Sequence, residues 1–277
     1  IEVNYQDFRN SSGESIEVGD GASINANTGS VAFDRTVYPV PYGTDSTSGF
    51  KEHATAHSGT ATYLPQGDVI VHVRVTDADY NVSASGEDKI QDTNVTVKIE
   101  RGSSSKLLAV YGNITAHAAN GITEVSPDSG VFEADITVDY NDGPTNTCPS
   151  ALSTGCILQG DIITVEYADQ NDASGKSQTV TDSATFDLRN GVLQSDKSVY
   201  LIGSDMILTL IEPDFDLDND GAQSVTLDII EWDSDADTTV LGTGGSAANA
   251  AAFDPEPSTF RETGDSTGIF QVVIEIP

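Results

Sequence analysis

Positively charged side chains are scarce in this sequence. Its 277 residues include 12 Lys and Arg against 44 Asp and Glu, which gives a formal net charge of −32. This deficit argues against nucleic-acid binding, which needs Lys and Arg to contact phosphates, and against docking onto an anionic lipid surface. Repulsion among so many carboxylates opposes the compact state unless cations neutralise it. We therefore expect bound Ca²⁺, dissolved salt or small cationic solutes as partners, although such acidity is also typical of halophilic proteins.

Long apolar runs and cysteine are also scarce. No apolar run reaches the length of a membrane span. The two cysteines, Cys148 and Cys156, lie in a loop rich in Pro, Thr, Ser and Gly, whereas zinc usually takes four ligands in closer pairs. We predict a local disulfide, which indicates an oxidising compartment outside the cytoplasm. Export also agrees with the N-x-[ST] sequons, which predict glycosylation at Asn10, Asn81, Asn94 and Asn113.

Motifs that carry catalysis are missing as well. The sequence has neither a G-x-S-x-G elbow nor a phosphate-binding glycine loop with its lysine. His53 and His57 are four residues apart, but they lie in a Gly/Ser/Thr-rich insertion and do not form H-E-x-x-H, so we do not predict zinc there. The single tryptophan, Trp232, is interpreted as a core residue, which leaves no aromatic cluster for a sugar-binding cleft.

Apolar side chains alternate with polar ones along many short segments. Val69, Val71, Val73 and Val75 alternate with more polar neighbours, and 132–140 and 163–167 follow the same period of two. Clusters of Gly, Asn, Asp and Ser separate these segments, as in turns. Because no 12-residue window shows an amphipathic helix, the pattern predicts an all-β fold.

An internal repeat divides the chain. Residues 1–7 match 163–169, and 34–38 match 196–200, both at a spacing of 162 residues. Further along, 68–79 match 205–216 at a spacing of 137, because the first copy carries an insertion between Tyr38 and Asp68. The last matches pair 95–99 with 225–229 and 124–132 with 262–270.

Short strands in each copy, with one face toward water, predict tandem immunoglobulin-like β-sandwich domains. We place one at 30–182, with insertions, and a second at 191–277, which lacks its last strand. Residues 1–18 form a terminal strand that belongs to a preceding or neighbouring domain. The chain is thus out of phase with its repeat and starts without Met, as expected for an excerpt of a longer array or for subunits that share strands by β-strand addition.

The repeat resembles a known family. The acidic runs 77–81 and 213–218, with the segment 262–270, resemble the immunoglobulin-like repeats of archaeal surface-layer (S-layer) proteins, most closely those of ammonia-oxidising archaea. The resemblance covers most of the chain apart from 39–67 and the cysteine loop. It implies a two-dimensional extracellular coat that assembles with Ca²⁺, carries glycans, and acts as an anionic sieve for small cations such as ammonium.

The same acidic runs are the candidate metal sites. Side chains that alternate at a strand end point to one side, and Ca²⁺ prefers six to eight oxygen ligands. We predict Ca²⁺ ligands at Asp77, Asp79, Asn81, Asp214, Asp216, Asp218 and Asp220. The competing interpretation is that they are solvated turn residues, which we prefer for a third alternating set at 233–237.

The sequence therefore favours a structural cell-surface protein, an S-layer subunit or a segment of one, over an enzyme. Its partners would be further copies of itself or further domains of the same chain. The alternative is a strand-exchanging extracellular filament subunit or adhesin. A secreted hydrolase or carbohydrate-binding module is a third hypothesis.

Overall fold

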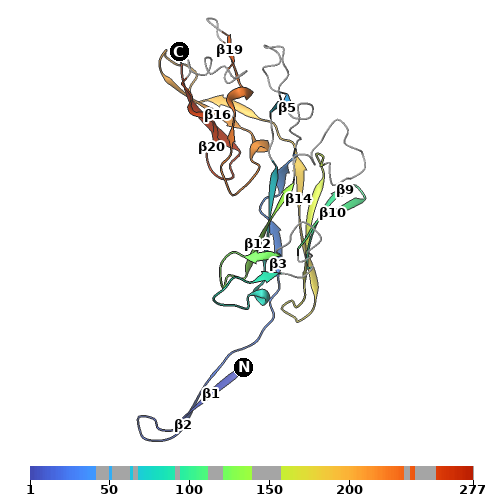
Figure 1. Ribbon diagram of the computed structural model, residues 1–277, viewed down its shortest axis with the longest axis vertical. Helices are drawn as coiled ribbons and strands as arrows, with labels where there is room; N and C mark the ends of the chain where they lie inside the picture. Colours follow the sequence, from blue (N-terminus) through green and yellow to red (C-terminus); the bar gives the residue numbers. More distant parts are fainter. Residues whose placement is uncertain are drawn as a thin grey trace.

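The computed structural model of the protein describes residues 1–41, 50–51, 63–64, 68–90, 94–111, 121–138, 157–233, 238–240 and 254–276. As predicted, the fold is all-β: strands make up nearly all of the regular structure, and short 3-10 helices supply the rest. Three bodies follow one another along the long axis of the molecule (Figure 1). These are an N-terminal hairpin, a central sandwich and a C-terminal unit.

The central sandwich consists of two five-stranded sheets. One sheet has the spatial order β3 (Ser30–Phe33), β7 (Val69–Thr76), β12 (Val131–Val138), β11 (Ile122–Glu124) and β8 (Lys89–Ile90). The other has the order β10 (Ser104–Tyr111), β9 (Val95–Arg101), β13 (Ile162–Asp169), β14 (Gln178–Asp187) and β4 (Val37–Pro39). All pairs are antiparallel except β14 with β4, which is parallel. A further pair, β5 (Phe50–Lys51) and β6 (Tyr63–Leu64), comes from the insertion.

Alternating side chains from both sheets fill one core. The valines of β7 at 69, 71, 73 and 75 are fully buried, and so are Phe132 on β12 and Tyr167 on β13. Each such side chain contributes roughly 1.5–3 kcal/mol when it leaves water. The period of two in the sequence thus becomes the inner face of a sandwich. β14 continues the core past the expected domain end at Asp182, because Phe186 is also fully buried.

The C-terminal unit has one five-stranded sheet and its own core. The order is β15 (Val192–Ser195), β16 (Asp205–Ile211), β21 (Ile269–Glu275), β20 (Glu256–Glu262) and β17 (Ser224–Val225). A hairpin of β18 (Glu231–Asp233) and β19 (Thr238–Val240) and the 3-10 helix η4 (Leu227–Ile229) accompany it. Two other 3-10 helices follow β7 and β16, namely η1 (Ala78–Tyr80) and η3 (Pro213–Phe215).

The sheet of the C-terminal unit repeats the first sheet of the sandwich strand for strand. Val75 lies opposite Phe132 in the sandwich, and Leu210 lies opposite Phe270 in the C-terminal unit. Val75 and Leu210 are 135 positions apart by their numbers, so the spacing of 137 expected for this block is wrong by two residues. The residue equivalent to Asp77 is therefore Glu212, and Asp214 is equivalent to Asp79.

The expected match of 95–99 with 225–229 is also wrong. Val225 pairs with Phe260 as Ile90 pairs with Ile122, so β17 is the counterpart of β8 and not of β9. After Val225 the chain leaves the sheet and forms η4. There the backbone hydrogen bonds form a helical turn and not pairs with a neighbouring strand.

The N-terminal hairpin stands apart from the sandwich. It consists of β1 (Glu2–Asp7) and β2 (Ile16–Gly21), and residues 22–29 connect it to β3. Figure 1 shows it at the end of the molecule opposite the C-terminal unit. Nearly all of its side chains are exposed, including the apolar ones on one face.

Candidate functional site

The first predicted acidic site does not continue the strand. β7 ends at Thr76, and Asp77 caps η1: its carboxylate accepts the Asp79 backbone N–H at 2.8 Å. The expectation that 77, 79 and 81 alternate on one side is wrong, because a helical turn replaces the extended backbone there. The Tyr167 hydroxyl donates to Asp77, and burial raises the pKa of Asp77 despite these hydrogen bonds.

Asp79 holds the segment that connects the N-terminal hairpin to the sandwich. Its carboxylate accepts the backbone N–H of Asn27 at 3.0 Å and the Asn27 amide Nδ2 at 2.9 Å. Asn81, the third predicted ligand, donates from Nδ2 to Asp128 at 3.1 Å. The carboxylate of Asp79 is therefore occupied by hydrogen bonds from the segment that connects the hairpin to the sandwich.

The second acidic site repeats this arrangement. Glu212 caps η3 and accepts the Asp214 N–H at 3.2 Å. Asp214 accepts the backbone N–H of Arg189 at 2.8 Å and the Arg189 Nε at 3.2 Å. Arg189 lies in the connection between β14 and β15, at the position equivalent to Asn27. We call these two pairs, Asn27–Asp79 and Arg189–Asp214, the linker clamps.

The rest of the second acidic run contacts the central sandwich. Arg35 donates to the carbonyl oxygen of Asp216 at 2.8 Å and to its Oδ1 at 3.3 Å. Both side chains are largely buried, and burial raises the pKa of Asp216 although Arg35 opposes that shift. The backbone N–H of Ile70 donates to the carbonyl oxygen of Leu217 at 2.9 Å. These contacts define the junction between the sandwich and the C-terminal unit.

His72 lies at the same junction. Its Nδ1 is 2.8 Å from Asp135 and its Nε2 is 3.0 Å from Asp218, with Asp220 at 3.8 Å from Nδ1. Burial alone would lower the pKa of His72, but hydrogen bonds to Asp218 and Asp135 and the charge of Asp34 outweigh burial and raise it. In the sequence His72 is one of the polar residues that alternate with the valines of β7, and nothing in this local pattern indicates its partner 146 residues away.

Two buried glutamates close matching loops. Glu124 and Glu262 are 2% and 4% exposed, and each accepts backbone N–H groups of the loop that follows it. Hydrogen bonds to the charged carboxylate lower the pKa of Glu124, with the N–H of Asp88 as the largest cause. The donors are Asp88, Ser129 and Gly130 for Glu124, and Gln223, Thr267 and Gly268 for Glu262.

Among the described residues, no group of three or more His, Cys, Asp or Glu side chains is placed to hold a metal ion. The predicted Ca²⁺ ligands have separate structural contacts instead: Asp77 caps η1 and Asn81 donates to Asp128, Asp79 and Asp214 belong to the linker clamps, and Asp216, Asp218 and Asp220 lie at the junction. Of the sequons, Asn94 is buried and its amide Nδ2, where a glycan would be attached, donates to Tyr80 at 2.6 Å. Asn10 lies in the turn of the N-terminal hairpin, and Asn113, Cys148 and Cys156 lie outside the described residues, as do His53 and His57.

No protein-family model matches this chain, and no curated protein is similar to it in sequence. The helices in the described part of the chain are all too short to cross a membrane.

Proposed function

We propose that the chain is a structural protein of the cell surface, an S-layer subunit or a segment of one, in which sandwiches follow one another at fixed orientations. The observation that carries this proposal is the repeated linker clamp. Asp79 and Asp214 each hold backbone N–H and side chain of the equivalent linker residue, Asn27 or Arg189. A linker whose backbone is hydrogen-bonded to the neighbouring domain suits a load-bearing array better than it suits an enzyme whose domains must open and close.

The strand order supports immunoglobulin-like domains. The order β3-β7-β12-β11 corresponds to an ABED sheet, and β10-β9-β13-β14 corresponds to a C′CFG sheet. The C-terminal unit repeats the ABED part as β15-β16-β21-β20. Tandem domains of this kind are the building blocks that the proposed array requires.

The charge supports an extracellular role near cations. Three of the scarce basic side chains, Arg35, Arg101 and Arg189, each pair with a mostly buried carboxylate. The remaining carboxylates leave a field that enriches small cations within about a Debye length, ~8 Å at physiological salt. Ca²⁺ bound between neighbouring copies, glycans at Asn10, and the disulfide of Cys148 with Cys156 are parts of the same proposal.

Electron microscopy of the purified protein with and without Ca²⁺ tests this function. We expect two-dimensional lattices with Ca²⁺ and their loss on addition of a chelator. Lattices that persist in the chelator would refute the role of Ca²⁺ but would still support a two-dimensional array. The exposed N-terminal hairpin favours a second candidate, a strand-exchanging filament, for which the same micrographs would show fibres in place of sheets.

A further inference from the structure

The N-terminal hairpin is a second copy of the β13–β14 hairpin. Its strands pair in the same register, because Val3 opposes Asp20 as Val165 opposes Asp182. Each residue of the first pair lies 162 positions before its equivalent in the second pair. The turns also agree, because Asn10 accepts the N–H of Ser12 and of Glu14 as Asp172 accepts that of Ser174 and of Lys176. Two segments that fold so alike carry the same kind of binding face.

The apolar face of the β13–β14 hairpin is covered by the opposite sheet, whereas the equivalent face of the N-terminal hairpin is exposed. Ile163, Val165 and Tyr167 on β13 are each 0% exposed, because they lie against the sheet of β3, β7 and β12. Their equivalents on β1 are Ile1, Val3 and Tyr5, which are 74%, 66% and 65% exposed. Phe186 on β14 is fully buried, whereas its equivalent Ile24, which follows β2, is 78% exposed.

The described part of the C-terminal unit lacks the hairpin that would complete its sandwich. Its described strands comprise one sheet and the β18–β19 hairpin, with no counterpart of β13 and β14 among them. In the sandwich, β14 pairs in parallel with β4, which buries Tyr38, Pro39 and Val40. The equivalent segment of the C-terminal unit, 200–202, has no strand partner in the described structure, and Leu201 and Ile202 are 76% and 87% exposed.

We infer that the N-terminal hairpin of one copy of this chain docks onto the C-terminal unit of a second copy and completes its sandwich. The occupant is a second copy because the chain itself shows, at β13–β14, how a hairpin of this register is seated on such a sheet. β1 would lie beside β18, and residues 23–25 would pair in parallel with 199–201, as 185–187 pair with 37–39. The interface adds strands to an open edge, which otherwise invites aggregation.

The polar contacts of this interface follow from those inside the sandwich. There the Tyr167 hydroxyl donates to Asp77, Asp169 accepts the N–H of Gly29 at 2.9 Å, and Asp182 accepts the N–H of Phe33 at 2.8 Å. The equivalent contacts between copies join Tyr5 to Glu212, Asp7 to Gly191, and Asp20 to Ser195. Gly191 already resembles Gly29, because a Cβ at either glycine would clash with a carboxylate, that of Glu212 at Gly191 and that of Asp77 at Gly29.

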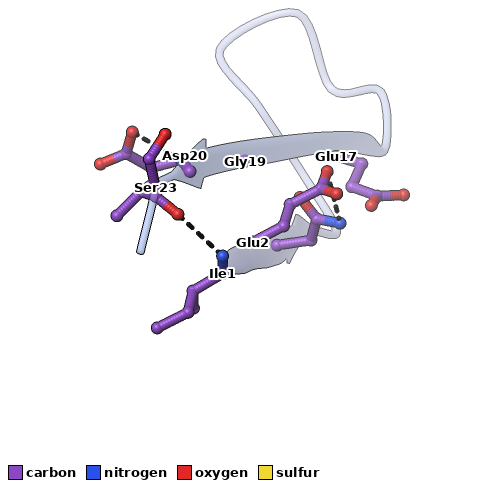
Figure 2. Close-up of a pocket in the computed structure, with 9 residues that line it drawn as sticks. Ile1, Glu2, Glu17, Gly19, Asp20 and Ser23 are labelled. Atoms are coloured by element: carbon purple, nitrogen blue, oxygen red, sulfur yellow. Dashed lines mark hydrogen bonds between the residues drawn. The ribbon is translucent and has the colours of Figure 1, made fainter. Parts of the chain in front are cut away.

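The hairpin is also presented for docking. The clamp between Asn27 and Asp79 fixes its connection to the sandwich, and Figure 1 shows it clear of the other bodies. At its open end the Ile1 amine donates to the Ala22 carbonyl at 2.8 Å, which closes the ribbon beside a shallow hollow (Figure 2). This inference does not depend on the proposed surface-layer role, since head-to-tail docking would serve a sheet or a fibre.

Cross-linking between two full-length variants tests the docking. Ser23→Cys and Val199→Cys place thiols at the positions equivalent to the paired Thr185 and Val37. We expect a disulfide-linked dimer, with a peptide joining positions 23 and 199, only when the two variants are mixed and oxidised. Ser12→Cys, in the turn of the hairpin, is the matched control and should give no such dimer with Val199→Cys. Equal cross-linking by both mixtures would overturn the inference.

A second measurement covers the case in which the cross-link fails for geometric reasons. Tyr5→Ser removes a side chain that is exposed in its own chain, so the stability of the monomer should not change. We expect self-association, followed by sedimentation velocity, to weaken at least about tenfold, whereas Asn4→Ser on the opposite face of β1 should have no effect. A chain that stays monomeric at all concentrations, or equal effects of the two variants, would refute the interface. Dimers without lattices would refute only the surface-layer function.

Discussion

Replacing Arg35 by Met should release the C-terminal unit from the sandwich without unfolding either. Arg35 donates to the carbonyl oxygen and the carboxylate of Asp216, and the two side chains are 12% and 11% exposed. Removing one partner of a fully buried pair costs about 3–5 kcal/mol, and an exposed pair contributes about 0–1. For this largely buried pair we expect a cost of about 2–3 kcal/mol, which shifts the docking equilibrium by roughly 30- to 150-fold.

Hydrogen exchange at the Ile70 amide measures that shift. Ile70 donates to Leu217 across the junction, so its protection reports docking, whereas amides within the β7–β12 ladder report the stability of the sandwich. We expect Ile70 to exchange faster by the factor above while the ladder stays protected. Arg74→Met is the matched control, since its pair with Glu133 is much more exposed. The double variant Arg35→Met with Asp216→Asn should recover part of the loss, because no unpaired charge remains. Unchanged protection of Ile70 in Arg35→Met would refute the reasoning.

Two further predictions concern pH and backbone geometry. Because the pKa of His72 is raised, its stabilisation of the junction is fully present below pH 6.5, the ordinary pKa of histidine, and is lost as the pH rises through the raised pKa. We therefore expect the hydrogen-exchange protection of the Ile70 amide to fall over this pH range in the native protein but not in His72→Gln. Gly268→Ala should destabilise the chain in urea by more than Gly130→Ala, because both have φ near +60° but a Cβ lies 2.9 Å from backbone at Gly268 and 3.4 Å at Gly130. Each should lose about 1–2 kcal/mol from the left-handed conformation alone. A larger loss at Gly130 would contradict the geometric argument.

The strands were readable from the sequence because burial on one face imposes a period of two, as on β7. The same period explains the error in the repeat. A shift of two residues leaves every side chain on its own face, so the similarity of Asp77 to Asp214 could outweigh the true pairing with Glu212. The structure decides the register through Val75 and Leu210, which lie opposite equivalent phenylalanines.

The acidic runs were visible in the sequence, but the contacts that their side chains make were not. Asp79 and Asp214 bind a linker, and Asp216 binds Arg35, far away in the sequence. Contacts of such separation leave no trace in local patterning. The N-terminal hairpin shows the opposite case, because its match to β13–β14 was visible in the residues alone, and the structure gives both the same register.

The linker clamps have a geometric consequence. Only residues 188–191 separate β14 from β15, and the clamp at Arg189 fixes them against η3. The clamp therefore favours one rotation of the C-terminal unit relative to the sandwich over a wide range of angles. Repeated along many units, one rotation generates a helix or a curved wall, so the radius of any assembly built from this chain would be encoded in a few linker residues and would change when Arg189 is replaced.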